Sequence, residues 1–184
     1  MTDLTDRARA FALHAHAGQR RKSLRPTPYA VHLYEVADFV TRHSGDEIAI
    51  AAAWLHDTVE DCGTAPETLA RDFGPDVAAV VAELTDDKSL PKQVRKDAQV
   101  SSAPRKSARA VLVKLGDKAS NTASVGLAPG RDWSLNRRRA YLDWAEAVIA
   151  ALPTPPATAV AETLMLIARS RTLLDAEAAL ERAA

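Results

Sequence analysis

One stretch in the first half of the chain constrains the fold more than any other. Residues 51–62 read Ala-Ala-Ala-Trp-Leu-His-Asp-Thr-Val-Glu-Asp-Cys, an apolar run typical of a buried helix that ends on four ionisable residues: His56, Asp57, Glu60 and Asp61. Residues three and four apart share a helix face, so the last two lie one turn beyond the first two. Burying such a face is costly unless something compensates the charges. A divalent metal would do so, because imidazole and carboxylate are ligands of manganese, iron and zinc.

An ordinary helix end explains the same stretch about as well. Cys62 and Gly63 are typical of a helix C-terminus, where the acidic residues would be exposed to solvent. A His-Asp dipeptide is also common in proteins without a metal. The stretch alone therefore leaves both interpretations open, and the rest of the chain has to decide between them.

Length and composition limit the class of protein. The 184 residues fit one domain with a sizeable core, and the formal net charge of zero argues against nucleic acid as a partner. The single cysteine excludes an internal disulfide and suits a reducing compartment. The N-terminus is charged from residue 3, and the longest apolar run, residues 48–55, is too short to span a bilayer. We therefore expect a cytoplasmic protein that has no signal peptide and does not bind a membrane.

The order of elements predicts an all-α fold. Glycine is scarce, with 7 in the chain, and alternating β-branched runs are few. We expect helices at about residues 6–18, 29–43, 47–62, 67–73, 76–84, 92–100, 107–125 and 134–152, and a last helix after the prolines of residues 153–156. A succession of helices without strands places the fold in the all-α class.

Three of the expected helices carry a candidate metal ligand. His32, the pair His56-Asp57 and Asp117 each lie among apolar neighbours, and Asn121 follows Asp117 by one turn. Two imidazoles and two carboxylates form one ligand set that leaves positions for water or phosphate. This favours a buried metal site over the exposed helix end.

These residues resemble the ligand pattern of the HD-domain metal-dependent phosphohydrolases. Further segments are similar to the hydrolase domain of the RelA/SpoT homologues, namely residues 15–22 (Ala-His-Ala-Gly-Gln-Arg-Arg-Lys), 28–32 (Pro-Tyr-Ala-Val-His), 55–61 (Leu-His-Asp-Thr-Val-Glu-Asp) and 114–121 (Lys-Leu-Gly-Asp-Lys-Ala-Ser-Asn). The resemblance covers about residues 5–152. We see no synthetase domain, so the chain looks like a small alarmone hydrolase of the Mesh type. The resemblance implies one HD-type domain over residues 1–184, in which residues 153–184 form a helical extension on the core.

The resemblance also implies an HD-domain helical bundle around a single metal site and a role for each matching residue. The metal, usually manganese with iron, cobalt or zinc as alternatives, would be bound by His32, His56, Asp57 and Asp117. Glu60 and Asp61 would orient or deprotonate the attacking water. The nucleotide would be contacted by Arg21 stacking on the guanine, by Lys22 and Ser23, by Asn121, by Ser124 where the family often has threonine, and by Tyr141 near the 5′-phosphates.

The implied activity is hydrolysis of the 3′-pyrophosphate of ppGpp and pppGpp to GDP or GTP and pyrophosphate. Alternatives are an HD-domain enzyme acting on the 2′-phosphate of NADPH or on a 3′-phosphorylated adenosine nucleotide, and a catalytically silent nucleotide-binding module. The presence of Glu60 and Asp61 argues against a catalytically silent module. A homodimer is left open, as is the choice between solvated surface and phosphate binding for two groups of basic residues: Arg137, Arg138 and Arg139, and Lys92, Lys96 and Lys106. His14, His16 and His43 are expected to be ordinary surface or core residues.

Overall fold

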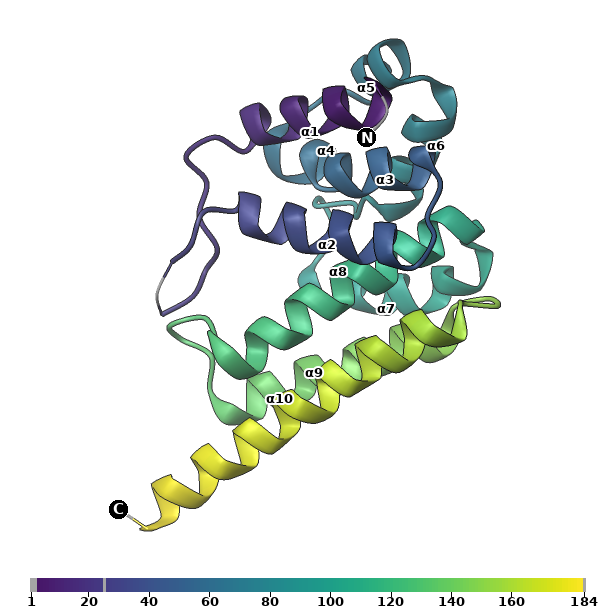
Figure 1. The fold of residues 1–184 in the computed structure, drawn as a ribbon. Helices are drawn as coiled ribbons and strands as arrows, with labels where there is room; N and C mark the ends of the chain where they lie inside the picture. Colours follow the sequence, from purple (N-terminus) through teal and green to yellow (C-terminus); the bar gives the residue numbers. More distant parts are fainter. Residues whose placement is uncertain (1–2, 25, 184) are drawn as a thin grey trace.

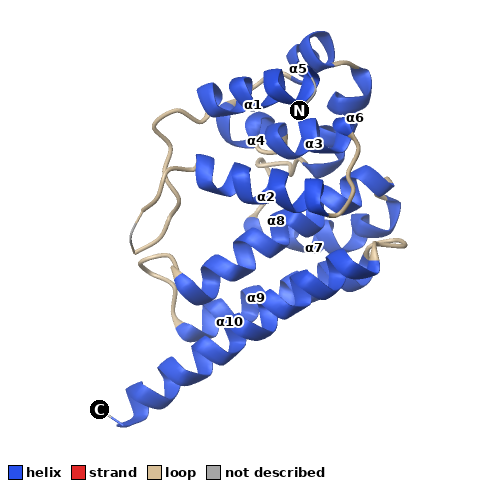
Figure 2. Cartoon of the chain, in the orientation of Figure 1, coloured by secondary structure: helices blue, strands red, loops and turns tan. Residues whose placement is uncertain are grey.

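The computed structural model describes residues 3–24 and 26–183, and these form a bundle of helices without a strand (Figures 1 and 2). In chain order the helices are α1 (Asp3–Ala15), α2 (Ala30–Arg42), α3 (Glu47–Leu55), α4 (Thr58–Cys62), α5 (Pro66–Phe73), α6 (Pro75–Leu84), α7 (Lys92–Ser102), the 3₁₀ helix η1 (Ala103–Arg105), α8 (Ala108–Leu127), α9 (Leu135–Ala151) and α10 (Ala157–Ala183). The predicted all-α class is confirmed. No helix in the described part of the chain is both long and apolar enough to cross a membrane.

Side chains of the expected kind begin the helices that carry the site. The carboxylate of Asp46 accepts a hydrogen bond from the backbone N–H of Ala49 at 2.9 Å and caps α3. Ser107 and Ser134 cap α8 and α9 in the same way. Each of these oxygens satisfies a backbone donor that has no partner within its helix, which contributes about 1 kcal/mol per cap.

Helix α3 lies in the upper half of the molecule as drawn in Figure 1 and contacts α1, α2, α6 and α8. Residues 51–55 are all buried, and three of the five are alanine. Because alanine side chains are small, four neighbouring helices can approach this short segment closely. The apolar run in the sequence is therefore the middle of the core, and the His-Asp pair that follows it is held inside the protein.

The helix predicted over residues 47–62 is interrupted at the His-Asp pair, which corrects the sequence prediction. Helix α3 ends at Leu55, and α4 begins at Thr58 after a turn. The hydroxyl of Thr58 donates to the carbonyl of Leu55 at 2.7 Å, and His56 Nδ1 lies 2.7 Å from the carbonyl of Ala53. Both side chains compete with the backbone for helical carbonyl groups, which favours a break at this point.

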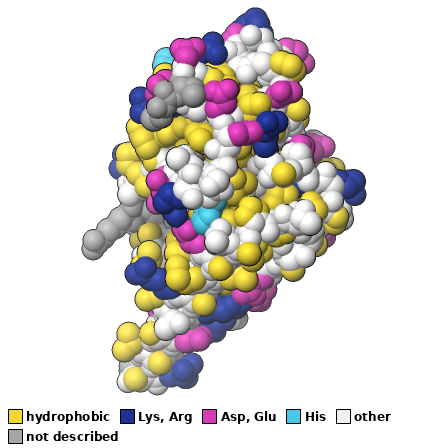
Figure 3. Space-filling view, turned by 45° about the vertical axis from the view of Figure 1, so that its right-hand side comes forward, with side chains coloured by type: hydrophobic (Ala, Val, Ile, Leu, Met, Phe, Trp, Pro, Cys, Tyr) yellow, Lys and Arg dark blue, Asp and Glu magenta, His cyan; other side chains and the backbone are white. Residues whose placement is uncertain are grey.

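Two glycines let long helices pack against α8. At Gly116 a Cβ atom would lie 3.3 Å from the backbone oxygen of Val36, so α2 passes directly over this position. At Gly126 a Cβ would lie 2.8 Å from the Cα of Ser170 on α10. Helix α10 packs along α8 and α9, and its last turns extend beyond the other helices at the lower left of Figure 1. On the face drawn in Figure 3, acidic and basic side chains are interspersed, in line with the net charge of zero.

We expect Gly126→Ala to destabilise the fold. Alanine favours a helix by about 1 kcal/mol over glycine, but overpacking costs about 1–3 kcal/mol, and the Cα of Ser170 cannot rotate away. The net loss should lower the melting temperature by about 2–4 °C per kcal/mol. Ala168→Ser on the exposed face of α10 is the control and should have almost no effect. A melting temperature that rises in Gly126→Ala would contradict this packing.

Candidate metal and nucleotide site

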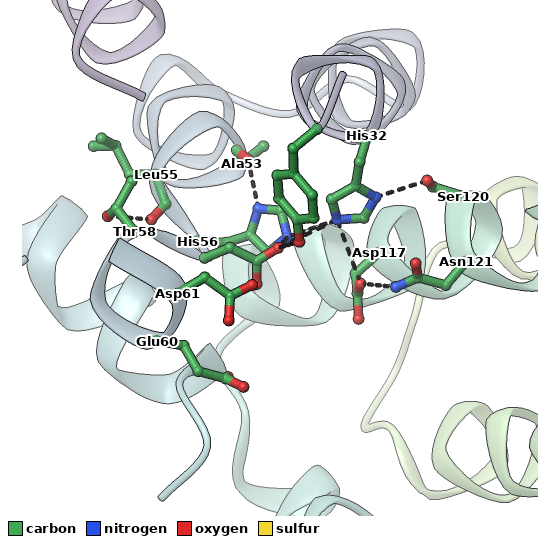
Figure 4. A network of polar contacts seen from close by, with 12 residues as sticks. His32, Ala53, Leu55, His56, Thr58, Glu60, Asp61, Asp117, Ser120 and Asn121 are labelled. Carbon is green, nitrogen blue, oxygen red and sulfur yellow. Dashed lines mark hydrogen bonds and ion pairs between the residues drawn. The ribbon is translucent and has the colours of Figure 1, made fainter. Parts of the chain in front are cut away.

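Four side chains from α2, α8 and the α3–α4 junction meet inside the bundle (Figure 4). His32 Nε2 lies 3.2 Å from His56 Nε2, and Asp57 Oδ2 lies 3.0 Å from His56 Nε2 and 3.4 Å from His32 Nε2. Asp117 Oδ1 is 3.8 Å from His32 Nε2. The structure thus brings together the four residues that the sequence nominated as metal ligands.

The hydrogen bonds at Nδ1 orient both imidazoles so that their Nε2 atoms face one another and Asp57. His56 Nδ1 lies 2.7 Å from the carbonyl of Ala53, which can only accept, so Nδ1 carries a proton. His32 Nδ1 lies 2.7 Å from the hydroxyl of Ser120, which itself donates to the carboxylate of Glu35 at 2.6 Å. With each Nδ1 atom engaged in this way, the neutral form of either imidazole has its Nε2 lone pair directed into the cluster, beside a carboxylate. Such outer hydrogen bonds are what orients histidine ligands in metal sites, and the arrangement fits a divalent cation.

The electrostatics of this cluster also favour a positive charge. Burial opposes a charge on His56, but the carboxylates of Asp57 and Asp117 outweigh it and raise the pKa of His56 to about 9. Burial likewise opposes a charge on Asp57, yet the imidazoles of His56 and His32 hold its pKa well below the usual range. The buried carboxylates remain ionised and attract a cation, and a proton or a metal ion can meet this demand.

Asp117 faces two lysines as well as the histidines. Its carboxylate lies 3.3 Å from Lys118 Nζ and 3.9 Å from Lys114 Nζ. Burial alone would raise the pKa of Asp117, but the lysines reverse the effect and lower it to about 2. Lys118 is itself buried, which lowers its pKa to about 8, and its ammonium group lies 4.1 Å from the centre of the Trp144 ring.

Glu60 and Asp61 lie on α4 and line the same cavity, of about 290 Å³, as His56, Asp57 and Asp117. Asp61 forms a very short contact with Lys88, and Glu60 Oε1 lies 3.8 Å from the same ammonium group. Glu60 also accepts from the backbone N–H of Asp86 at 3.2 Å. Burial raises the pKa of Glu60, which brings a carboxylate closer to the range of a general base.

A second cavity of about 500 Å³ adjoins the first. All six residues nominated for nucleotide contacts line it: Arg21, Lys22, Ser23, Asn121, Ser124 and Tyr141. Both cavities share Tyr29, Asp61, Asn121, Trp133 and Tyr141 in their walls. A ligand can therefore extend from the basic loop after α1 to the carboxylate and histidine cluster.

Arg21 lines the larger cavity and is held there by hydrogen bonds in the plane of its guanidinium group. Nη1 donates to Glu35 at 2.9 Å and to Ser120 at 3.0 Å, and Nη2 donates to Asn121 Oδ1 at 3.2 Å. Asn121 in turn donates to Asp117 at 2.5 Å. Bonds along the edges leave a flat face of the guanidinium group for stacking on a base.

Tyr29 is a candidate site residue that the sequence reasoning did not nominate. Its hydroxyl donates to Asp57 Oδ2 at 2.5 Å, burial and the neighbouring carboxylates raise its pKa, and its ring stacks on that of His16 at 4.8 Å. Tyr29 holds the carboxylate of Asp57 in place. The sequence feature that could have identified Tyr29 is its position three residues before His32, on the same helix face.

For some basic residues the sequence left open whether they face solvent or bind phosphate, and the structure places them differently. Lys92 and Lys96 line the smaller cavity, next to the histidine and carboxylate cluster. Arg137 lies over the ring of Trp133 at 4.4 Å. The others have structural partners: Lys106 contacts the carbonyl of Glu83, the buried Arg138 pairs with Glu177, and Arg139 pairs with Asp175. His43 follows the last residue of α2 and pairs with Glu162 at 2.8 Å.

The fold and the site define an all-helical protein with a buried histidine and carboxylate centre. A family model described as HD domain matches residues 8–138. The mouse guanosine-3′,5′-bis(diphosphate) 3′-pyrophosphohydrolase MESH1 is 43% identical over 144 residues, which cover 77% of this chain and 80% of the mouse protein. The MESH1 protein of Drosophila melanogaster is 40% identical over 141 residues, covering 76% of this chain and 79% of that protein.

A solved structure agrees with these similarities. It is that of a metazoan ortholog of SpoT that hydrolyses ppGpp and plays a role in starvation responses, and it matches with a TM-score of 0.87 at 35% identity. The match covers 94% of this chain and 98% of that one. The chain therefore belongs to the HD domain family and, within it, to the group of MESH1 proteins.

We expect removal of the metal to destabilise the protein, because one ion would tie together α2, α8 and the α3–α4 junction. Binding specific to the folded state contributes about 2.7 kcal/mol at a hundredfold excess over the dissociation constant. The melting temperature should fall on chelation and recover when Mn²⁺ is added. Asp57→Ala serves as the control, since its melting temperature should not respond to chelator. An unchanged melting curve, together with no metal by elemental analysis, would contradict a metal site here.

Proposed function

We propose that this protein hydrolyses the 3′-pyrophosphate of ppGpp and pppGpp, giving GDP or GTP and pyrophosphate. The observation that carries the proposal is the shared wall between the cavity of the basic loop and the cavity of the histidine and carboxylate cluster. A guanosine nucleotide with phosphates on both sides of its ribose needs two such adjoining regions. The similarity to MESH1 proteins and to a SpoT ortholog that hydrolyses ppGpp supports the same substrate.

The larger cavity would hold the nucleoside. The free face of Arg21 would stack on the guanine, while Lys22 and Ser23 would contact the nucleotide from the same loop. Asn121 would contact the ribose, since it lies between Arg21 and Asp117 and lines both cavities. Ser124 would contribute a further hydroxyl, and Tyr141 would lie near the 5′-phosphates.

The smaller cavity would hold the pyrophosphate that is removed. Lys92, Arg95, Lys96, Lys114 and Lys118 all line it. Burial lowers the pKa of Lys92, Lys96 and Lys118, so these ammonium groups would gain from an anionic partner. These cations in the wall of the cavity would orient the phosphate groups.

His32, His56, Asp57 and Asp117 would hold one divalent ion, which we propose to be Mn²⁺, with Fe, Co or Zn as alternatives for the same ligand set. Such an ion supplies Lewis acidity, because it lowers the pKa of water and neutralises phosphate oxygens. Tyr29 would keep Asp57 in position through its hydrogen bond.

Glu60 would take the proton of the attacking water, and Asp61 would orient that water or assist Glu60. The water oxygen forms a bond to the phosphorus next to the ribose 3′-oxygen. The bond between this phosphorus and the 3′-oxygen breaks, and the 3′-oxygen takes up a proton. The raised pKa of Glu60 suits a group that must accept a proton and release it again.

We further propose that the whole chain acts as one domain. Helix α10 packs along α8, and Ser170 on α10 donates to the carbonyl of Thr122, one residue after Asn121. The extension after residue 152 would thus support the helix that carries Asp117. The proposed bounds 1–184 include residues 1, 2, 25 and 184, which lie outside the described residues.

The direct test is a substrate panel. Purified protein with Mn²⁺ is incubated with ppGpp, pppGpp, the 3′-pyrophosphorylated adenosine analogue and NADPH, and the products are separated by chromatography. We expect GDP or GTP together with pyrophosphate, and the fastest turnover for the guanosine nucleotides. Release of phosphate from NADPH alone, or no product from any nucleotide, would refute the proposed substrate.

A pair of neighbouring substitutions tests the division of roles. Asp57→Ala should lose metal and activity together, because it removes a ligand. Glu60→Gln keeps the shape but cannot take a proton, so it should retain metal and nucleotide binding and turn over about 10²- to 10⁴-fold more slowly. Metal content, nucleotide affinity and kcat are measured for each variant. Loss of metal in Glu60→Gln would place this residue among the ligands, and normal turnover would move proton transfer to Asp61.

A further inference from the structure

Two residues outside the proposed catalytic chemistry lie between Arg21 and His32. Glu35 is one turn after His32 on α2, and Ser120 is one turn after Asp117 on α8. Glu35 Oε2 accepts from Arg21 Nη1 at 2.9 Å and from the Ser120 hydroxyl at 2.6 Å. Ser120 Oγ also lies 2.7 Å from His32 Nδ1 and 3.0 Å from Arg21 Nη1.

The direction of these hydrogen bonds follows from the groups involved. A carboxylate only accepts and a guanidinium group only donates, so Ser120 must give its single proton to Glu35. The two lone pairs of Ser120 then accept from Arg21 and from the Nδ1–H of His32. Glu35 therefore determines the orientation of the Ser120 hydroxyl, and this hydroxyl determines which nitrogen of His32 is free for a metal.

The same carboxylate holds the guanidinium group of Arg21. The Arg21 side chain is 12% exposed, so its conformation is restricted by these partners rather than by solvent. Arg21 also reaches Asp117 through Asn121. The arginine at the nucleotide cavity is thus connected to two of the four candidate metal ligands, and Glu35 and Ser120 form the connection to His32.

We propose that Glu35 and Ser120 are positioning residues that link the nucleotide-binding arginine to the metal ligand His32, so that breaking the pair weakens metal and nucleotide binding together. The inference rests on the proposed function for the identity of the nucleotide. Packing between α2 and α8 is apolar at Val36, Phe39 and Gly116, and these contacts remain when the polar pair is broken.

The test compares Glu35→Ala, Glu35→Gln and Ser120→Ala with the wild type. Mn²⁺ affinity is measured by titration of the nucleotide-free protein, GDP affinity by equilibrium binding, and KM and kcat with ppGpp. Ser120→Ala should weaken Mn²⁺ binding by about 10- to 100-fold, the usual effect of removing a partner of a metal ligand. Glu35→Ala acts through Ser120, so it should weaken Mn²⁺ binding as well, but by less. Glu35→Ala should also weaken GDP binding and raise KM more than it lowers kcat.

Glu35→Gln is the conservative variant. Its amide oxygen can still accept from Ser120 and Arg21, but it has no charge. It should restore most of the Mn²⁺ affinity lost in Glu35→Ala, and its GDP affinity should lie between those of Glu35→Ala and the wild type.

Asp38→Ala is the matched control. Asp38 is also an acidic residue on α2, but it pairs with Arg42 on the exposed face at 2.8 Å. It should leave Mn²⁺ affinity, GDP affinity and KM unchanged.

Three results would overturn the inference. Glu35→Ala could retain wild-type Mn²⁺ and GDP affinities, whatever its melting temperature; it could lose only one of the two affinities; or Asp38→Ala could reproduce its losses. Because the Mn²⁺ and GDP measurements require no turnover, a protein that fails to hydrolyse ppGpp would refute the proposed function and still give a clear result for the positioning pair.

Discussion

The structure depends on burying four ionisable side chains close together in the core. Two imidazole nitrogens lie 3.2 Å apart in the core, with two carboxylates beside them. Burying these groups is favourable only when a positive charge lies among them, since an uncompensated buried carboxylate costs several kcal/mol. The protein does not avoid this cost by exposing the groups. It fixes the two imidazoles by hydrogen bonds at Nδ1, so that Nε2 of each faces the cluster, and it fixes Asp57 and Asp117 by hydrogen bonds from Tyr29 and Asn121.

The hydrogen bonds behind the cluster extend the site well beyond the four candidate ligands. Tyr29 supports Asp57, Ser120 supports His32, and Asn121 supports Asp117. The last two of these supports are also contacts of Arg21, at the edge of the neighbouring cavity. The proposed region for the nucleoside and the proposed region for the metal therefore share a continuous polar network of direct contacts.

Small residues in the surrounding bundle let the helices pack closely enough to bring the site residues together. Alanines allow four helices to surround α3, and Gly116 and Gly126 let α2 and α10 lie directly against α8. Close approach of backbones places side chains from distant parts of the chain within hydrogen-bonding distance. It also leaves little room for relaxation, because protein interiors are packed about as densely as organic crystals.

The sequence by itself determined the all-α class, the approximate helices, and the group of residues that would meet at the site. Helical periodicity and the isolation of His32, Asp57 and Asp117 among apolar neighbours are local properties, so they can be recognised without a structure. Only the tertiary structure decided what each side chain contacts. Arg137 and Arg138 are adjacent and identical in type, yet one lies over Trp133 and the other is buried against Glu177, 39 residues away. The break before α4 and the connection of Glu35 through Ser120 to His32 were hidden for the same reason, since they depend on partners that approach only when the helices pack.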